Sequence, residues 1–148
     1  MMPAPFVPPH LISALLRQRS RLIALETGLI EVSLIVERFS AIEAISKSFA
    51  IEMDCLSPSA HLDTVELARQ EITLRLMLAD GRYRAWHGFV VDCASMGGDG
   101  GLARYRLTVA PWLERLRGRV DCYVYQDKTA QEIVEEVFRD YPAANFQF

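Results

Sequence analysis

The chain has 148 residues, of which 51% are apolar, and it carries a formal net charge of −3. This length suits one domain, and the apolar content is too high for a disordered protein. The negative charge argues against nucleic-acid binding, because nucleic-acid-binding domains are usually basic. The three cysteines (Cys55, Cys93 and Cys122) are an odd number and lie far apart, which favours free thiols over a disulfide framework.

Residues 1–19 are predicted to form a leader outside the main domain. Residues 1–10 contain four prolines, which favour an extended chain, and residues 11–19 have the apolar spacing of a short amphipathic helix. No secretory signal peptide is expected, because the start of the chain lacks a basic region and charged residues interrupt the apolar run that follows. The sequence therefore predicts a protein made in the cytoplasm that needs no cleaved leader to leave the cell.

Three strands are predicted next, at residues 21–27, 33–44 and 46–56. Each alternates with the two-residue period of a β-strand. In the second strand Leu34, Val36 and Arg38 are expected to share a face. In the third the alternation predicts one apolar face, made of Phe49, Ile51, Met53 and Cys55. Residues 62–68 are predicted to form one helical turn, capped by Asp63 or Thr64.

Residues 71–112 are predicted to be a β-meander, which is the centre of the fold. Asp80-Gly81 predicts the first hairpin turn, because glycine reaches positive φ without a Cβ clash. A glycine-rich stretch at residues 96–101 predicts the second turn, and Pro111 ends the third strand. In the middle strand one apolar face is expected, formed by Tyr83, Ala85, His87, Phe89, Val91 and Cys93.

The opposite face of the meander is predicted to be strongly basic. Six residues are assigned to it: Arg75, Arg82, Arg84, Trp86, Arg104 and Arg106. A solvated face with carboxylate partners elsewhere is the alternative for each arginine taken alone. Because arginine and tryptophan are enriched at hot spots, the group favours a protein–protein interface with an acidic partner.

The C-terminal part is predicted to contain both helix and strand. A short helix or turn is expected at residues 112–116 and strands at 119–125 and 145–148. Thr129 and Glu132 form a capping box at the start of an amphipathic helix that reaches about residue 140, before Pro142. The whole chain is thus expected to be mainly β (α+β), with an antiparallel meander or barrel-like domain and one C-terminal amphipathic helix.

No catalytic, cofactor or metal site is predicted. The glycines at 98–101 have the residue spacing of a dinucleotide-binding motif. That motif requires a helix directly after the glycines, and a strand is predicted there instead. His10, His61 and His87 lack metal-ligand spacing, and His87 is expected to be a core or interface residue. The enzyme hypothesis is left with His87, Asp92 and Lys128 as its only candidates, and we expect no enzymatic activity.

Several segments, in order, resemble the N-terminal hub module of VgrG, the spike protein of type VI secretion, which is similar to the baseplate hub of contractile phage tails. The resemblance runs from about residue 20 to the end. The segments that carry it are Val36-Glu37-Arg38-Phe39-Ser40, Trp86-His87-Gly88, Leu102-Ala103-Arg104-Tyr105-Arg106-Leu107-Thr108, Pro111-Trp112-Leu113 and Tyr125-Gln126-Asp127-Lys128-Thr129.

The resemblance implies a structural, non-enzymatic role without cofactors. The module would be a tube-like domain that assembles as a homotrimeric ring on the hexameric tube protein (Hcp) and helps deliver effector or adaptor proteins through the type VI apparatus. Residues 20–148 would be the first hub domain, truncated at its C-terminal end. The alternatives are a stand-alone small β-barrel that binds a ligand, and a phage-tail baseplate hub protein.

Overall fold

The computed structural model describes residues 22–28, 34–68, 70–99 and 101–148. The chain divides into two compact units, Met1–Pro111 and Trp112–Phe148, and each is described by itself. The leader and helix predicted for residues 1–19 lie outside the described residues. Within the described part, no helix is long and apolar enough to cross a membrane.

Unit 1 is one six-stranded sheet in which every neighbouring pair is antiparallel, in the order β1-β4-β5-β6-β3-β2. This confirms the predicted mainly antiparallel fold and its central meander β4-β5-β6. The strands are β1 (Ile23–Thr27), β2 (Ile35–Ala44), β3 (Lys47–Ser57), β4 (Glu71–Met77), β5 (Tyr83–Asp99) and β6 (Leu102–Ala110).

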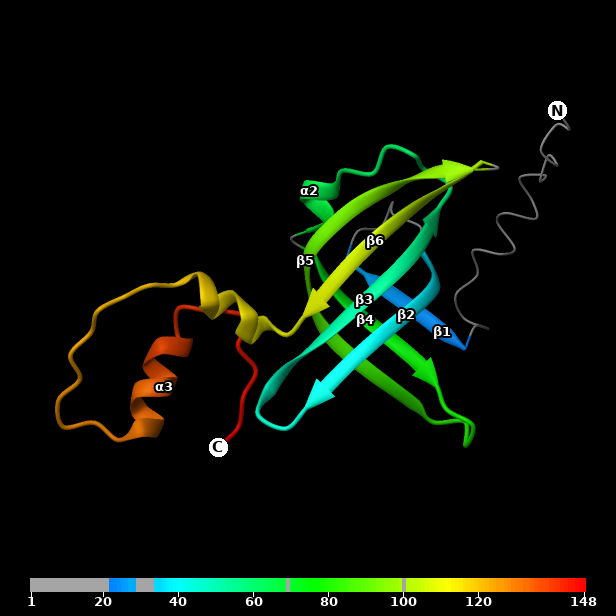
Figure 1. Ribbon diagram of the computed structural model, residues 1–148. Coiled ribbons are helices and arrows are strands. Elements are labelled where there is room, and N and C mark those ends of the chain that lie inside the picture. The colour runs from blue at the N-terminus through cyan, green and yellow to red at the C-terminus, as the bar shows by residue number, and fades with distance from the viewer. Residues whose placement is uncertain (1–21, 29–33, 69, 100) are drawn as a thin grey trace, which may run out of the picture. The chain divides into compact units, whose positions relative to one another are not determined.

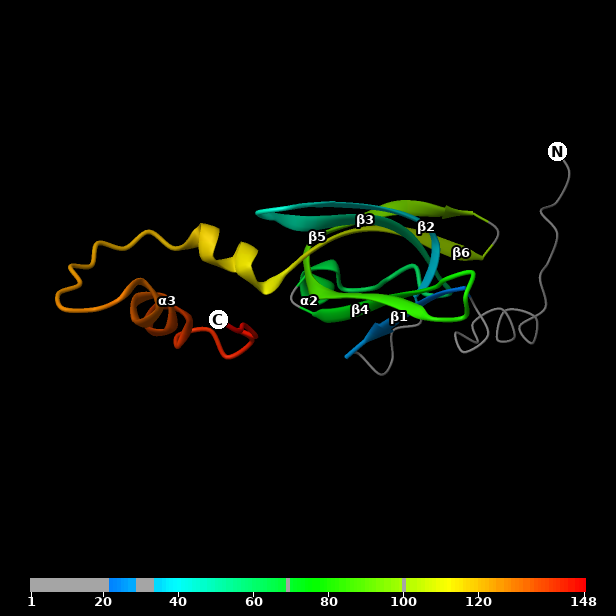
Figure 2. The same cartoon turned by 90° about the horizontal axis from the view of Figure 1, so that it is seen from below.

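The sheet curls into two facing layers because β5 serves two neighbours along its length. Its first half, up to Phe89, pairs with β4, and its second half pairs with β6. Gly88 lies at the change of partner, and a Cβ built there would meet the Ala110 carbonyl oxygen at 2.4 Å. Figure 2 shows the result, with β4 and β1 in one layer and β2, β3 and β6 in the other. The curl encloses the core between the layers.

The core confirms most of the predicted alternation. Ile51, Met53 and Cys55 of β3 are buried in it, with Phe49 packed against them. The predicted helical turn is present as α2 (Thr64–Leu67), which Asp63 caps by accepting from the backbone N–H groups of Val65 and Glu66. Its Leu67 reaches the core.

The prediction for the faces of β5 was wrong for the first half of the strand, although Phe89 is buried and Cys93 packs against the core as predicted. Trp86 stands opposite Leu74 on β4 and shares the core with it, whereas His87 stands opposite Thr73 and is 62% exposed. Directly paired residues lie on the same face, so the core position of Leu74 decides that of Trp86. A register shift between Val90 and Asp92 then breaks the single alternation that was predicted over the whole strand.

A second bulge corrects the prediction for β2. The register shifts between Val36 and Arg38, so Glu37 is the additional residue. Val36 is buried, whereas Arg38 points away from the core and is exposed. Leu34, Val36 and Arg38 therefore do not share a face.

Unit 2 contains a 3₁₀ helix η2 (Trp112–Gly118) and a helix α3 (Ala130–Phe138). Both were predicted, and the capping box of Thr129 and Glu132 is present. The strands predicted at 119–125 and 145–148 were wrong, because no described strand lies beside them to complete a ladder. Phe138 instead packs edge-on against Trp112 and Phe146, each at 4.8 Å between ring centroids.

We predict that Gly88→Ala lowers the free energy of unfolding by about 2–3 kcal/mol, since the added Cβ meets backbone atoms that cannot turn aside. Gly28→Ala is the matched control, because its Cβ would meet only the Gln70 side chain at an ordinary 3.5 Å. Urea denaturation of both variants measures the effect. Equal stability of the two variants would contradict the role given to Gly88.

Candidate interface site

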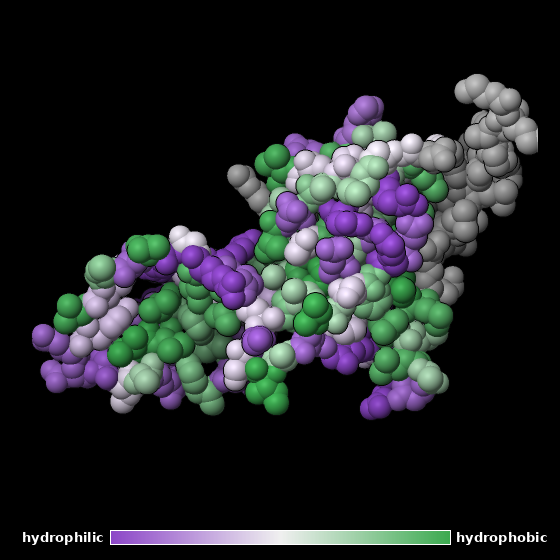
Figure 3. Space-filling view, in the orientation of Figure 1, coloured by the Kyte–Doolittle hydropathy of each residue, from purple (hydrophilic) through white to green (hydrophobic). Residues whose placement is uncertain are grey.

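A cluster of paired charges covers the outer face of β2, β3 and β6. Ala103, Tyr105 and Leu107 of β6 point into the core, so the residues between them, Arg104 and Arg106, point outward. The hydrophilic patch on the near face in Figure 3 lies over these strands. The guanidinium groups of Arg104 and Arg106 therefore lie on the outer face of unit 1, away from its core.

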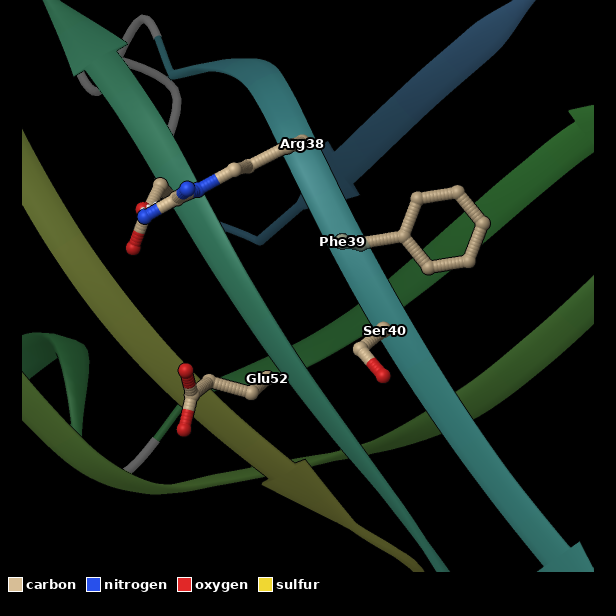
Figure 4. Close-up of a pocket in the computed structure, with 5 residues that line it drawn as sticks. Arg38, Phe39, Ser40 and Glu52 are labelled. Atoms are coloured by element: carbon tan, nitrogen blue, oxygen red, sulfur yellow. Dashed lines mark hydrogen bonds and ion pairs between the residues drawn. The ribbon is translucent and has the colours of Figure 1, made fainter.

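Asp54 of β3 is the centre of this cluster, and its side chain is only 3% exposed. Arg106 Nε donates to Oδ1 at 2.8 Å, and Arg38 Nε donates to Oδ2 at 2.6 Å. Figure 4 shows the Arg38 side chain reaching from β2 across β3, while Phe39 points the other way. One carboxylate thus holds two guanidinium groups that come from strands on either side of it.

The ion pairs keep these groups charged. The hydrogen bond from Arg106, helped by that from Arg38, lowers the pKa of Asp54 to about 2, although burial opposes the shift. The same bond raises the pKa of Arg106. Arg104 makes a two-pronged contact with Glu37, at 2.9 and 3.0 Å, and this contact raises the pKa of Arg104.

Two shallow depressions open on this face. The smaller, of about 300 Å³, is lined by Arg38, Phe39, Ser40, Glu52 and Asp54. The larger, of about 590 Å³, is lined by Glu37, Arg38, Asp54, Met96, Arg104 and Arg106, and we call it the arginine depression. It holds three arginines beside the carboxylates of Glu37 and Asp54, and Arg106 also lies 3.7 Å from the carboxylate of Glu52, so each of these positive charges is paired within the chain. This arrangement of exposed guanidinium groups suits carboxylates of a partner.

The predicted site residues do not share one face, which corrects the prediction. Arg104 and Arg106 lie in the arginine depression. Arg75 pairs with Glu26 of β1 at 3.2 Å, and Arg82 pairs with Asp80 in the β4–β5 turn at 2.7 Å. Arg84 pairs with Glu43 of β2. Each arginine therefore has a carboxylate partner within the chain, and their role at an interface stays a prediction.

Trp86, the sixth predicted site residue, is a core residue. It is 8% exposed, the Phe39 ring meets it edge-on at 5.9 Å, and the Arg84 guanidinium lies 4.8 Å from its ring centroid. Its Nε1–H has no hydrogen-bond partner among the described residues. Arg84 therefore covers the tryptophan at the edge of the core, and the indole is unavailable to a partner.

Sequence reasoning missed Arg38, Asp54 and Glu37. Asp54 alternates with the apolar residues of β3, so the sequence places it on the face opposite the core, where a carboxylate usually gains little from pairing. No signal in the sequence shows that β2 and β6 flank β3, and this arrangement is what brings two arginines onto one buried acid. The amino-acid sequence of β2 also does not predict the bulge at Glu37.

The structure also shows the contacts of the other candidates that the sequence analysis named. A hairpin joins β5 to β6 as predicted, but β5 runs to Asp99, so residues 96–99 of the stretch predicted as a turn belong to the strand. His87 Nδ1 lies 2.9 Å from Thr73 Oγ1 on an exposed face, so His87 is not a core residue, and an interface position stays a prediction. Lys128 pairs with Glu136. No group of potential metal ligands occurs in the described residues.

Burial raises the pKa of the Cys55 thiol to about 12, and all three cysteines are free, as predicted.

We predict that Asp54→Asn lowers the free energy of unfolding by about 1–3 kcal/mol at pH 7, because two charge-assisted contacts are lost. The pKa of Asp54 is lower in the folded state than in the unfolded chain. Its ionised carboxylate therefore stabilises the fold fully at pH values above the pKa that Asp54 has in the unfolded chain. The difference between the native protein and the variant should therefore shrink as the pH falls from about 4 to about 2. Denaturation at several pH values measures it. Glu52→Gln is the control, and a pH-independent difference for Asp54→Asn would contradict this account.

Trp86→Ala should lower the free energy of unfolding by about 3–5 kcal/mol, because it leaves a cavity beside Phe39. The exposed Tyr83 on the same strand provides the comparison, and Tyr83→Ala should cost less than about 1 kcal/mol. Chemical denaturation followed by circular dichroism measures both. A small effect at Trp86 would instead favour the surface position first assigned to it.

Comparisons with known proteins agree with this architecture. The family model described as phage tail baseplate hub (GPD) matches residues 42–148. The type VI secretion system spike protein VgrG1b of Pseudomonas aeruginosa is 32% identical over 132 residues, which are 89% of this chain and 18% of that protein. VgrG1a of the same organism is 30% identical over 130 residues, covering 88% of this chain and 20% of that protein. The chain thus spans about a fifth of the length of these relatives.

A solved structure shares the fold. The E. coli c3393 protein, described as a component of the type VI secretion system with structural similarity to the T4 tail proteins gp27 and gp5, superposes with a TM-score of 0.71. Its sequence is 20% identical, and the match covers 82% of this chain and 33% of that one. Since the family model matches more than half of the chain, from β2 through the meander to α3, the chain belongs to the phage tail baseplate hub (GPD) family.

Proposed function

We propose that the chain is a structural hub domain of a type VI secretion spike. The observation that carries this proposal is the match of residues 42–148 to the baseplate hub family, together with relatives at about 30% identity that are type VI spike proteins. The first hub domain would span residues 20–148. Its work would be mechanical, and the outward ion pairs with a packed core support a role without enzymatic activity or cofactor.

The proposed assembly is a homotrimeric ring seated on the hexameric tube protein (Hcp). Two features support a ring built by sheet-to-sheet contact. The strands β1 and β2 are at the two ends of the sheet order, where a sheet can take a further strand from a neighbouring subunit. Arginines are spread over the surface, at Arg75, Arg82, Arg84, Arg104 and Arg106, where they could contact neighbouring subunits.

The protein would be made in the cytoplasm and exported through the type VI apparatus. There it would help to carry effector or adaptor proteins into target cells. A hub protein of a contractile phage tail is the second candidate, since the matching family model is named for phage tails. A stand-alone β-barrel that binds a ligand is less well supported, because the depressions of unit 1 are shallow and lined by paired charges.

A deletion in the source cells tests this function. We expect that removing the gene segment for residues 20–148 abolishes the appearance of the tube protein in the culture medium and the killing of competitor cells. The protein at its natural length should have the mass of a trimer in multi-angle light scattering and should bind purified tube protein. Complementation with the intact gene is the control.

Unchanged export after the deletion would contradict the spike role. A loss of phage particles, with type VI export intact, would instead favour the phage-tail hub.

A further inference from the structure

We draw no further inference here: the strongest candidate, the apolar surface patch at the tip of the β2–β3 hairpin of unit 1, where Ile42 is 70% and Ile45 is 96% exposed, carries none because nothing in the structure shows what covers it.

Discussion

The structure of unit 1 depends on the close approach of the β5 and β6 backbones at Gly88. A side chain at this position would collide with the Ala110 carbonyl, so only glycine lets β5 leave β4 and continue along β6. This change of partner curls one sheet into two layers. The curl encloses the apolar faces of all six strands, and it turns the alternating polar residues of β2, β3 and β6 outward as one charged surface.

The buried carboxylate of Asp54 is the second constraint, and it follows from the first. A buried charge is tolerated only when it is paired and hydrogen-bonded, and Arg38 and Arg106 meet that need from the two neighbouring strands. The ion pairs of Asp54 with Arg38 and Arg106 therefore connect β2, β3 and β6 on the outer face of the sheet, and the apolar core connects them on its inner face. The same contacts hold the two guanidinium groups in place on the outer face of the sheet.

Membership of the baseplate hub family supports a structural role, and the contacts of unit 1 agree with it. The strongest polar interactions of unit 1 cross from strand to strand, and its shallow depressions lie over paired charges. Unit 2 differs, because none of its residues is fully buried and the exposed Val120 and Val124 lie in a segment without a neighbouring strand in the described chain. Unit 2 therefore has little core of its own, and most of the chain's buried apolar area stabilises unit 1.

Local sequence patterns by themselves determined the meander with its Asp80-Gly81 turn, the apolar face of β3, the Asp63 cap of α2 and the capping box of α3. Each of these depends on residues a few positions apart, so the chain needs no other segment to specify it. The ordered motifs also identified the hub family. Only the tertiary structure decided which face of β5 enters the core, because the register with β4 places Trp86 opposite Leu74. It alone brought Arg38 and Arg106 onto Asp54 and left residues 119–125 without a strand, because sheet order and ladder partners are contacts between distant segments that no local pattern encodes.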